Sequence, residues 1–109
     1  MHTDGTATDW TQVVALYDQL VRLDPSPIVR LSRAIAVGQR DGLDAGLTLV
    51  DALAPQLSEY HAFHASRADL LRRMGRIAEA DEAYAAALNL ATNGAERAFL
   101  IRRREELRA

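Results

Sequence analysis

Two histidines, His61 and His64, lie three residues apart, a spacing at which one face of a helix can offer two imidazoles to a metal ion. Glu59 is the nearest further ligand, but it falls at the start of the predicted helix. The chain contains no cysteine, so thiolate metal sites, disulfides and cysteine nucleophiles are excluded together. The pattern favours a structural role for both histidines, and we expect neither a metal nor another cofactor.

Three carboxylates, Asp44, Asp51 and Asp69, have the chemistry of a general acid or base. They fall on exposed positions of predicted helices, and no nucleophile, glycine-rich loop or metal-ligand set stands beside them. We therefore expect these groups to be solvated charges and the chain not to be an enzyme.

Four arginines, Arg67, Arg72, Arg73 and Arg76, form a basic cluster around the end of one predicted helix. Cations at a helix C-terminus are stabilised by the helix dipole, so part of the cluster is ordinary helix design. The acidic residues expected to neutralise it are Glu79, Asp81 and Glu82. No aromatic residues interleave with the arginines, and the net charge of the chain is -2, so we expect no direct contact with nucleic acid.

These residues must be positioned by helices, because apolar residues recur at three- and four-residue steps along the chain and no alternating strand pattern occurs. Asp9, with Gln12 three residues later, predicts the first helix start, and Pro27 suits a first helical turn. Pro55 is expected to interrupt the third helix after Leu53, and Ser58 to open the fourth. We predict about six helices, following a loop or vector-derived remnant at residues 1–8.

The sequence resembles itself at a spacing of 34 residues: Ser32-Arg33-Ala34 falls on Ser66-Arg67-Ala68. The other matched pairs are Val37 and Leu71, Leu43 and Ile77, Gly46 and Ala80, Val50 and Tyr84, and Leu53 and Ala87. This period in a helical chain is typical of the tetratricopeptide repeat, whose helix pairs stack into a curved array.

We therefore expect an all-α fold in which antiparallel helix pairs form a short tetratricopeptide-repeat-type α-solenoid over residues 9–109. Residues 9–25 match the second helix of a truncated repeat, 27–55 and 58–92 form two repeats, and 95–109 form a capping helix. In the cap, Phe99 and Leu100 are expected to face the core.

The family geometry implies a concave surface, formed by the first helix of each unit, that binds a protein partner. The residues expected there are Leu31, Ile35, Gln39, Asp69, Arg72, Arg73, Phe99 and Arg103. For Leu31 and Ile35, core packing is an equally good interpretation.

The predicted first helix carries an apolar stripe wider than packing on one neighbour requires. Its residues are Val13, Val14, Leu16, Tyr17, Leu20 and Val21. We expect Val13, Val14, Tyr17 and Val21 to form a docking flank for a preceding helix. In the absence of that helix, a second copy of the chain could cover the flank and give a weak homodimer.

An ordered series of short blocks resembles something narrower than the repeat family. The blocks are Thr8-Asp9-Trp10, Val14-Ala15-Leu16-Tyr17-Asp18-Gln19-Leu20, Leu23-Asp24-Pro25-Ser26-Pro27, Arg33-Ala34-Ile35-Ala36-Val37, Tyr60-His61, Arg67-Ala68-Asp69-Leu70-Leu71-Arg72-Arg73 with Gly75-Arg76, and Ala95-Glu96-Arg97-Ala98-Phe99-Leu100. Together they are similar to the C-terminal tetratricopeptide-like extension of a group of bacterial extracytoplasmic-function RNA polymerase sigma factors.

The resemblance implies a cytoplasmic role in transcription initiation through protein contacts. The expected partners are the sigma domains of the same polypeptide, with RNA polymerase or a DGPF/YCII-type regulator as further candidates. The sigma domains themselves are missing here, so this chain is not expected to bind a promoter. The alternative is a free-standing tetratricopeptide adaptor that binds a partner unrelated to transcription. The start of the chain lacks signal-peptide character, and we expect no membrane association.

The 34-residue register predicts that Ala34→Leu and Ala68→Leu each destabilise the fold, because both alanines fall where helices should pass closest. Forcing extra methylenes into such a contact costs about 1–3 kcal/mol. Thermal unfolding of the two variants checks this, and unchanged midpoints would mean that the register is wrong.

Overall fold

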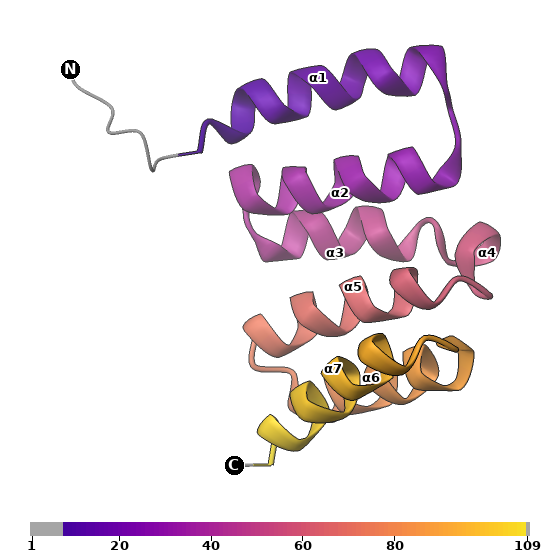
Figure 1. The fold of residues 1–109 in the computed structure, drawn as a ribbon. Coiled ribbons are helices and arrows are strands. Elements are labelled where there is room, and N and C mark those ends of the chain that lie inside the picture. Colours follow the sequence, from indigo (N-terminus) through magenta and orange to yellow (C-terminus); the bar gives the residue numbers. More distant parts are fainter. Residues whose placement is uncertain (1–7, 109) are drawn as a thin grey trace.

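The computed structural model describes residues 8–108, which form seven α-helices and no strand (Figure 1). The helices are α1 (Trp10–Leu23), α2 (Pro27–Asp41), α3 (Leu43–Asp51), α4 (Ala54–Leu57), α5 (His61–Arg73), α6 (Ile77–Leu90) and α7 (Gly94–Glu106). The prediction of an all-helical fold is confirmed for this part of the chain. The predicted loop at residues 1–8 lies outside the described residues except for Thr8.

The predicted number of helices is too low by one short element. The helix α3 ends at Asp51 rather than at Leu53, and Pro55 lies in the first turn of α4. Proline is tolerated there because the N–H that it lacks would have no partner within the helix. Ser58 does not open the fourth long helix: its backbone is helical and it ends α4, so α5 begins only at His61.

Local signals set the ends of the other helices. The carboxylate of Asp9 accepts a hydrogen bond from the backbone N–H of Gln12 at 3.1 Å, so the predicted N-cap of α1 is confirmed. Pro27 lies in the first turn of α2, where the Ser26 hydroxyl accepts from the Ile28 N–H. Gly42 follows α2 with a backbone φ of 113°, a left-handed conformation that favours glycine.

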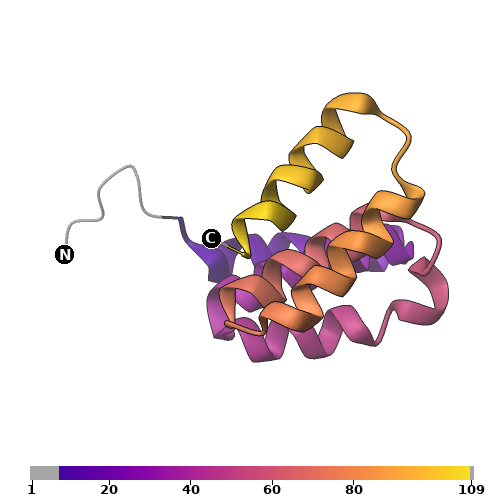
Figure 2. The same cartoon turned by 90° about the horizontal axis from the view of Figure 1, so that it is seen from below.

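Each long helix packs mainly on its neighbours along the chain, in the order α1, α2, α3, α5, α6 and α7. Figure 1 shows this succession from α1 at one edge to α6 and α7 at the other, and Figure 2 shows α7 leaning out from one side of the stack. The main core runs from α2 to α7, whereas a smaller cluster of Val14, Ala36 and Val37 joins α1 to α2.

Small residues lie where the helices approach most closely. Ala34 and Ala68, at equivalent positions of the 34-residue register, are both buried, as are Gly46 and Ala80. A Cβ atom added to Gly46 would lie 2.8 Å from the Cα atom of Gly38, a distance that real Cβ atoms essentially never show. The helices α2 and α3 therefore touch backbone to backbone, which only glycine at these two positions allows.

The last helix, α7, is attached to α6 by ion pairs and hydrogen bonds. The guanidinium Nε of Arg104 donates to the carboxylate of Asp81 at 2.7 Å, and Arg108 lies 3.6 Å from the same carboxylate. At the other end of α7, the Arg97 guanidinium donates to the carbonyls of Leu88 and Ala91. Leu100 is buried between these two attachments, so α7 is fixed along its length.

We predict that Gly46→Ala destabilises the protein by about 1–3 kcal/mol, because the added methyl group forces α2 and α3 apart. Elsewhere in a helix the same change adds about 1 kcal/mol of stability, so the sign of the effect reports the close contact. The matched control is Gly94→Ala, whose added Cβ meets no atom within 4 Å. Urea unfolding measures both, and a Gly46→Ala protein as stable as the control would contradict the helix contact.

We predict that Asp81→Asn lowers the thermal midpoint at pH 7, because it removes the partner of Arg104. The hydrogen bond from Arg104 lowers the pKa of Asp81 below its ordinary value of 3.8. A lowered pKa in the folded state means that the stabilisation is present above pH 3.8 and is lost as the pH falls further. Between pH 7 and pH 3.8 the midpoints of the two proteins should therefore differ, and they should approach each other as the pH falls below 3.8 and Asp81 becomes protonated in the folded protein. The adjacent Glu82→Gln, which removes no ion pair of the described residues, should show no such gap.

Candidate functional site

A groove of about 250 Å³ lies between α2, α5 and α7, and it gathers most of the residues predicted for partner binding. Six of the eight line it: Ile35, Gln39, Asp69, Arg73, Phe99 and Arg103. Ala65, Ser66, Leu70 and Tyr84 complete the lining. These side chains come from helices far apart in the sequence, so the groove exists only because the helices stack in this order.

The walls of the groove combine charge with one exposed aromatic ring. Arg73 donates to the side-chain carbonyl of Gln39 at 3.4 Å, across the 34 residues of the repeat, and lies 3.6 Å from the carboxylate of Asp69. The guanidinium carbon of Arg103 lies 5.3 Å from the centre of the Phe99 ring, within cation–π distance. One carboxylate and two guanidinium groups thus surround a partly apolar floor.

Two of the residues predicted for this surface do not line the groove. Leu31 is only 5% exposed and belongs to the main core, so core packing is the correct interpretation of this residue. Arg72 instead donates to the Asp69 carboxylate at 2.6 Å, and this hydrogen bond raises the pKa of its guanidinium. The role of Arg72 is therefore to hold Asp69, while Arg73 lies on the groove.

The prediction that Phe99 faces the core is wrong, because its side chain is 48% exposed. Leu100, the next residue, is buried instead. Successive residues are about 100° apart around a helix, and α7 packs mainly on α6, so Leu100 faces that contact and Phe99 does not. The exposed ring of Phe99 is what makes it available to the groove.

The apolar residues that α1 exposes differ from those expected to form its docking flank. Val14 is buried against Ala36 and Val37 of α2, so it is not part of an open surface. Val13, Tyr17 and Val21 are half-buried, because they border the same contact. The open apolar residues of α1 are Leu16, Leu20 and Leu23, which are exposed by 56%, 46% and 84%.

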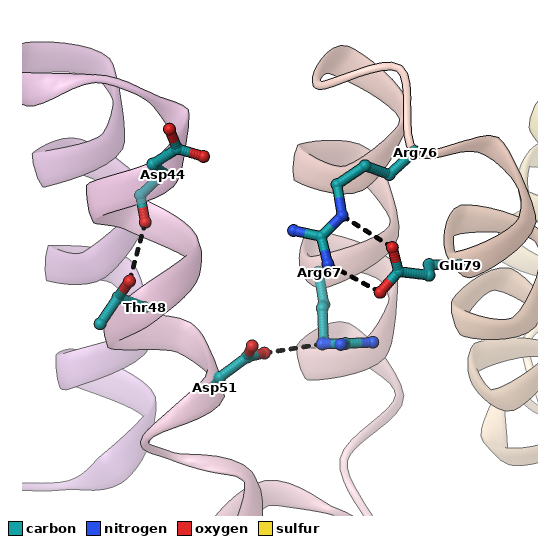
Figure 3. A network of polar contacts seen from close by, with 6 residues as sticks. All are labelled: Asp44, Thr48, Asp51, Arg67, Arg76 and Glu79. Atoms are coloured by element: carbon teal, nitrogen blue, oxygen red, sulfur yellow. Dashed lines mark hydrogen bonds and ion pairs between the residues drawn. The ribbon is translucent and has the colours of Figure 1, made fainter.

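The basic cluster at the end of α5 is largely neutralised (Figure 3). Arg67 donates to Asp51 of α3 at 2.7 Å, and Arg76 donates to Glu79 through two hydrogen bonds of 2.7 and 2.8 Å. The latter contact lowers the pKa of Glu79 and raises that of Arg76. Of the acidic residues expected to neutralise the cluster, Asp81 pairs with Arg104 of α7 instead.

The two histidines bind separate parts of the chain. The Nε2 atom of His64 lies 2.8 Å from the carbonyl oxygen of Ser58, while the Nδ1 atom of His61 lies 2.8 Å from the carboxylate of Glu96, off the line of a hydrogen bond. Residues 8–108 contain no group of three potential metal ligands. The hydrogen bond of His64 fastens the start of α5 to the end of α4. The Asp51 carboxylate is paired with Arg67, and the Asp69 carboxylate is paired with Arg72.

A larger cavity, of about 490 Å³, was not anticipated from the sequence. It lies among the first four helices and is lined by Asp18, Val21, Arg30, Arg33, Leu49, Ala52, Leu53 and Gln56. The Arg33 guanidinium donates to the Asp18 carboxylate at 2.6 Å, so one of the two guanidinium groups that line the cavity is already paired. The only sequence signal was the pair Arg30 and Arg33, three residues apart on one helix face.

None of the helices in the described part of the chain is long and apolar enough to cross a membrane. No protein-family model matches the sequence, and no solved structure matches it significantly. The chain is similar to an uncharacterized protein of Rhizobium meliloti (strain 1021), with 45% identity over 93 residues. The match covers 85% of this chain and 22% of that relative, so the chain spans about a fifth of the relative's length.

Proposed function

We propose that the chain is a protein-binding module built as a short tetratricopeptide-repeat-type α-solenoid. Two pairs of helices, α2 with α3 and α5 with α6, follow the 34-residue register. Equivalent positions are buried in both pairs: Val50 and Tyr84, like Leu53 and Ala87, belong to the main core. Contacts between successive helices, rather than around one central core, support this arrangement.

The observation that carries the proposal is the convergence of α2, α5 and α7 on one groove. These three correspond to the first helix of each unit and the cap, the elements whose inner faces form the binding surface of such arrays. A partner segment with an apolar side chain and an acidic group would complement Phe99 and the guanidinium groups of Arg73 and Arg103.

We further propose that the module serves an extracytoplasmic-function sigma factor in the cytoplasm and binds the sigma domains of the same polypeptide. The ordered blocks from Thr8 to Leu100 support this assignment. So does the length of the Rhizobium meliloti relative, since a protein of which the matched region is 22% has room for further domains. RNA polymerase and a DGPF/YCII-type protein are the next candidates as partners.

The test is binding of the purified chain to a separate fragment carrying sigma regions two and four from the same gene, measured by isothermal titration calorimetry. We expect Phe99→Ala to weaken binding about tenfold or more, as truncation of a central aromatic anchor does. The matched control is Ile101→Ala: Ile101 is exposed by 44%, close to the 48% of Phe99, but it lies outside the groove. Its affinity should not change.

Two outcomes would contradict the proposal. Absence of binding by the unaltered chain would remove the sigma-factor role, and a free-standing adaptor would then be the better interpretation. Equal weakening by Phe99→Ala and Ile101→Ala would place the contact away from the groove.

A further inference from the structure

The cavity of about 490 Å³ among the first four helices has no part in the proposed function. Its volume falls within the range of about 300–1,000 Å³ that small-molecule sites occupy. Figure 1 shows its surroundings: α1 ends, α2 begins and α3 passes into α4 at the same end of the stack. No residue lines both this cavity and the groove, so the two are separate sites.

The cavity lies on the inner side of α1, not on its exposed apolar face. Asp18 and Val21, the two residues of α1 that line it, follow the buried Val14 at steps of four and three residues. All three therefore lie on the side of α1 that packs on α2. Leu16 and Leu20, which are exposed, are not part of the lining. The cavity is thus formed by the packing of α1 to α4 on one another.

Half of the eight lining residues are apolar: Val21, Leu49, Ala52 and Leu53. Leu53 belongs to the main core and Ala52 is exposed, so the apolar lining extends from the core to the surface. Such a lining suits a hydrocarbon group, because removing apolar area from water is favourable.

Two guanidinium groups of α2 supply the polar part of the lining. Arg30 and Arg33 are three residues apart and therefore neighbours on the helix surface. The Nε atom of Arg33 donates to Asp18 at 2.6 Å, and this contact leaves the terminal nitrogens of the guanidinium group available. Arg30 forms no ion pair with any of the residues 8–108. Both arginines can therefore donate hydrogen bonds to a ligand.

The charges of the lining select the kind of ligand. Two guanidinium groups and the Asp18 carboxylate leave one positive charge in excess. A carboxylate carries one negative charge, and its two oxygens match the paired N–H donors of a guanidinium group. A phosphate group carries more than one negative charge at neutral pH, and the surplus would lie beside Asp18.

We propose that this cavity binds a small organic acid that has one carboxylate and an apolar body. The carboxylate accepts hydrogen bonds from Arg30 and Arg33, with the side-chain amide of Gln56 as a further donor, and the body packs on Leu49 and Leu53. Asp18 is a positioning residue: it orients Arg33 before the ligand arrives, so less side-chain freedom is lost on binding.

Titration of the purified chain with phenylbutyrate and with octanoate, followed by heteronuclear NMR, tests the proposal with an aromatic and an aliphatic body. We expect saturable shifts of the backbone signals of Ala52, Leu53 and Gln56, with a dissociation constant between about 50 µM and about 2 mM. Phenylbutyramide has the same body without the charge and should bind at least about tenfold more weakly. Inorganic phosphate, which has charge but no apolar body, should also bind at least about tenfold more weakly.

Arg30→Gln should weaken the binding of phenylbutyrate at least about fivefold, because it removes the unpaired guanidinium group and keeps a polar side chain. The matched control is Arg102→Gln, which makes the same change of charge at an exposed arginine of α7, outside the cavity. Its affinity should equal that of the unaltered chain. Thermal unfolding of both variants checks that each is folded.

Four results would overturn the proposal. The first is the absence of saturable shifts with both acids up to about 10 mM. The second is equal binding of phenylbutyrate and its amide, and the third is equal affinity of the Arg30→Gln and Arg102→Gln variants. The fourth is tighter binding of inorganic phosphate than of either acid, which would assign the cavity to a different class of anion.

Discussion

The contact between Gly38 of α2 and Gly46 of α3 is the constraint on which the rest of the stack depends. Because neither residue has a side chain, the two backbones touch, and α3 is held close enough to bury Leu47 and Val50. The helix α5 then packs on α3 and carries the next pair forward. In the second pair the position equivalent to Gly38 is Arg72, so only Ala80 is small of the two corresponding residues, and the long side chain of Arg72 holds Asp69. The same register thus gives a close contact in one pair and a polar support in the next.

The groove follows from this stacking, because it needs three helices that are not neighbours in sequence to present their side chains on one side. The hydrogen bond between Gln39 and Arg73 links two of them across one full repeat. The third, α7, is fixed to α6 by Asp81 and by the carbonyls that Arg97 binds. Loss of either attachment would move Phe99 and Arg103 away from the groove. The positions of Phe99 and Arg103 in the groove therefore depend on ion pairs and hydrogen bonds at the protein surface.

The arrangement separates two kinds of surface. The groove combines guanidinium groups, a carboxylate and an aromatic ring, and is suited to a partner segment of mixed character. The exposed face of α1 is apolar where Val13, Leu16, Tyr17 and Leu20 surround a shallow hollow.

The sequence by itself determined the helical fold, because the spacing of apolar residues, the N-cap at Asp9 and the proline in the first turn of α2 are local properties. It also indicated which residues could lie in one groove, since the 34-residue register places Ile35 and Asp69 at corresponding positions. It did not determine which member of an adjacent pair is covered. Leu31, Val14 and Phe99 each lie at the border of an apolar stripe, where a difference of about 100° decides burial. That choice depends on how neighbouring helices cross, and the crossing is set by packing contacts between residues far apart in the chain. Only the tertiary structure could therefore place Val14 and Leu31 inside and Phe99 outside.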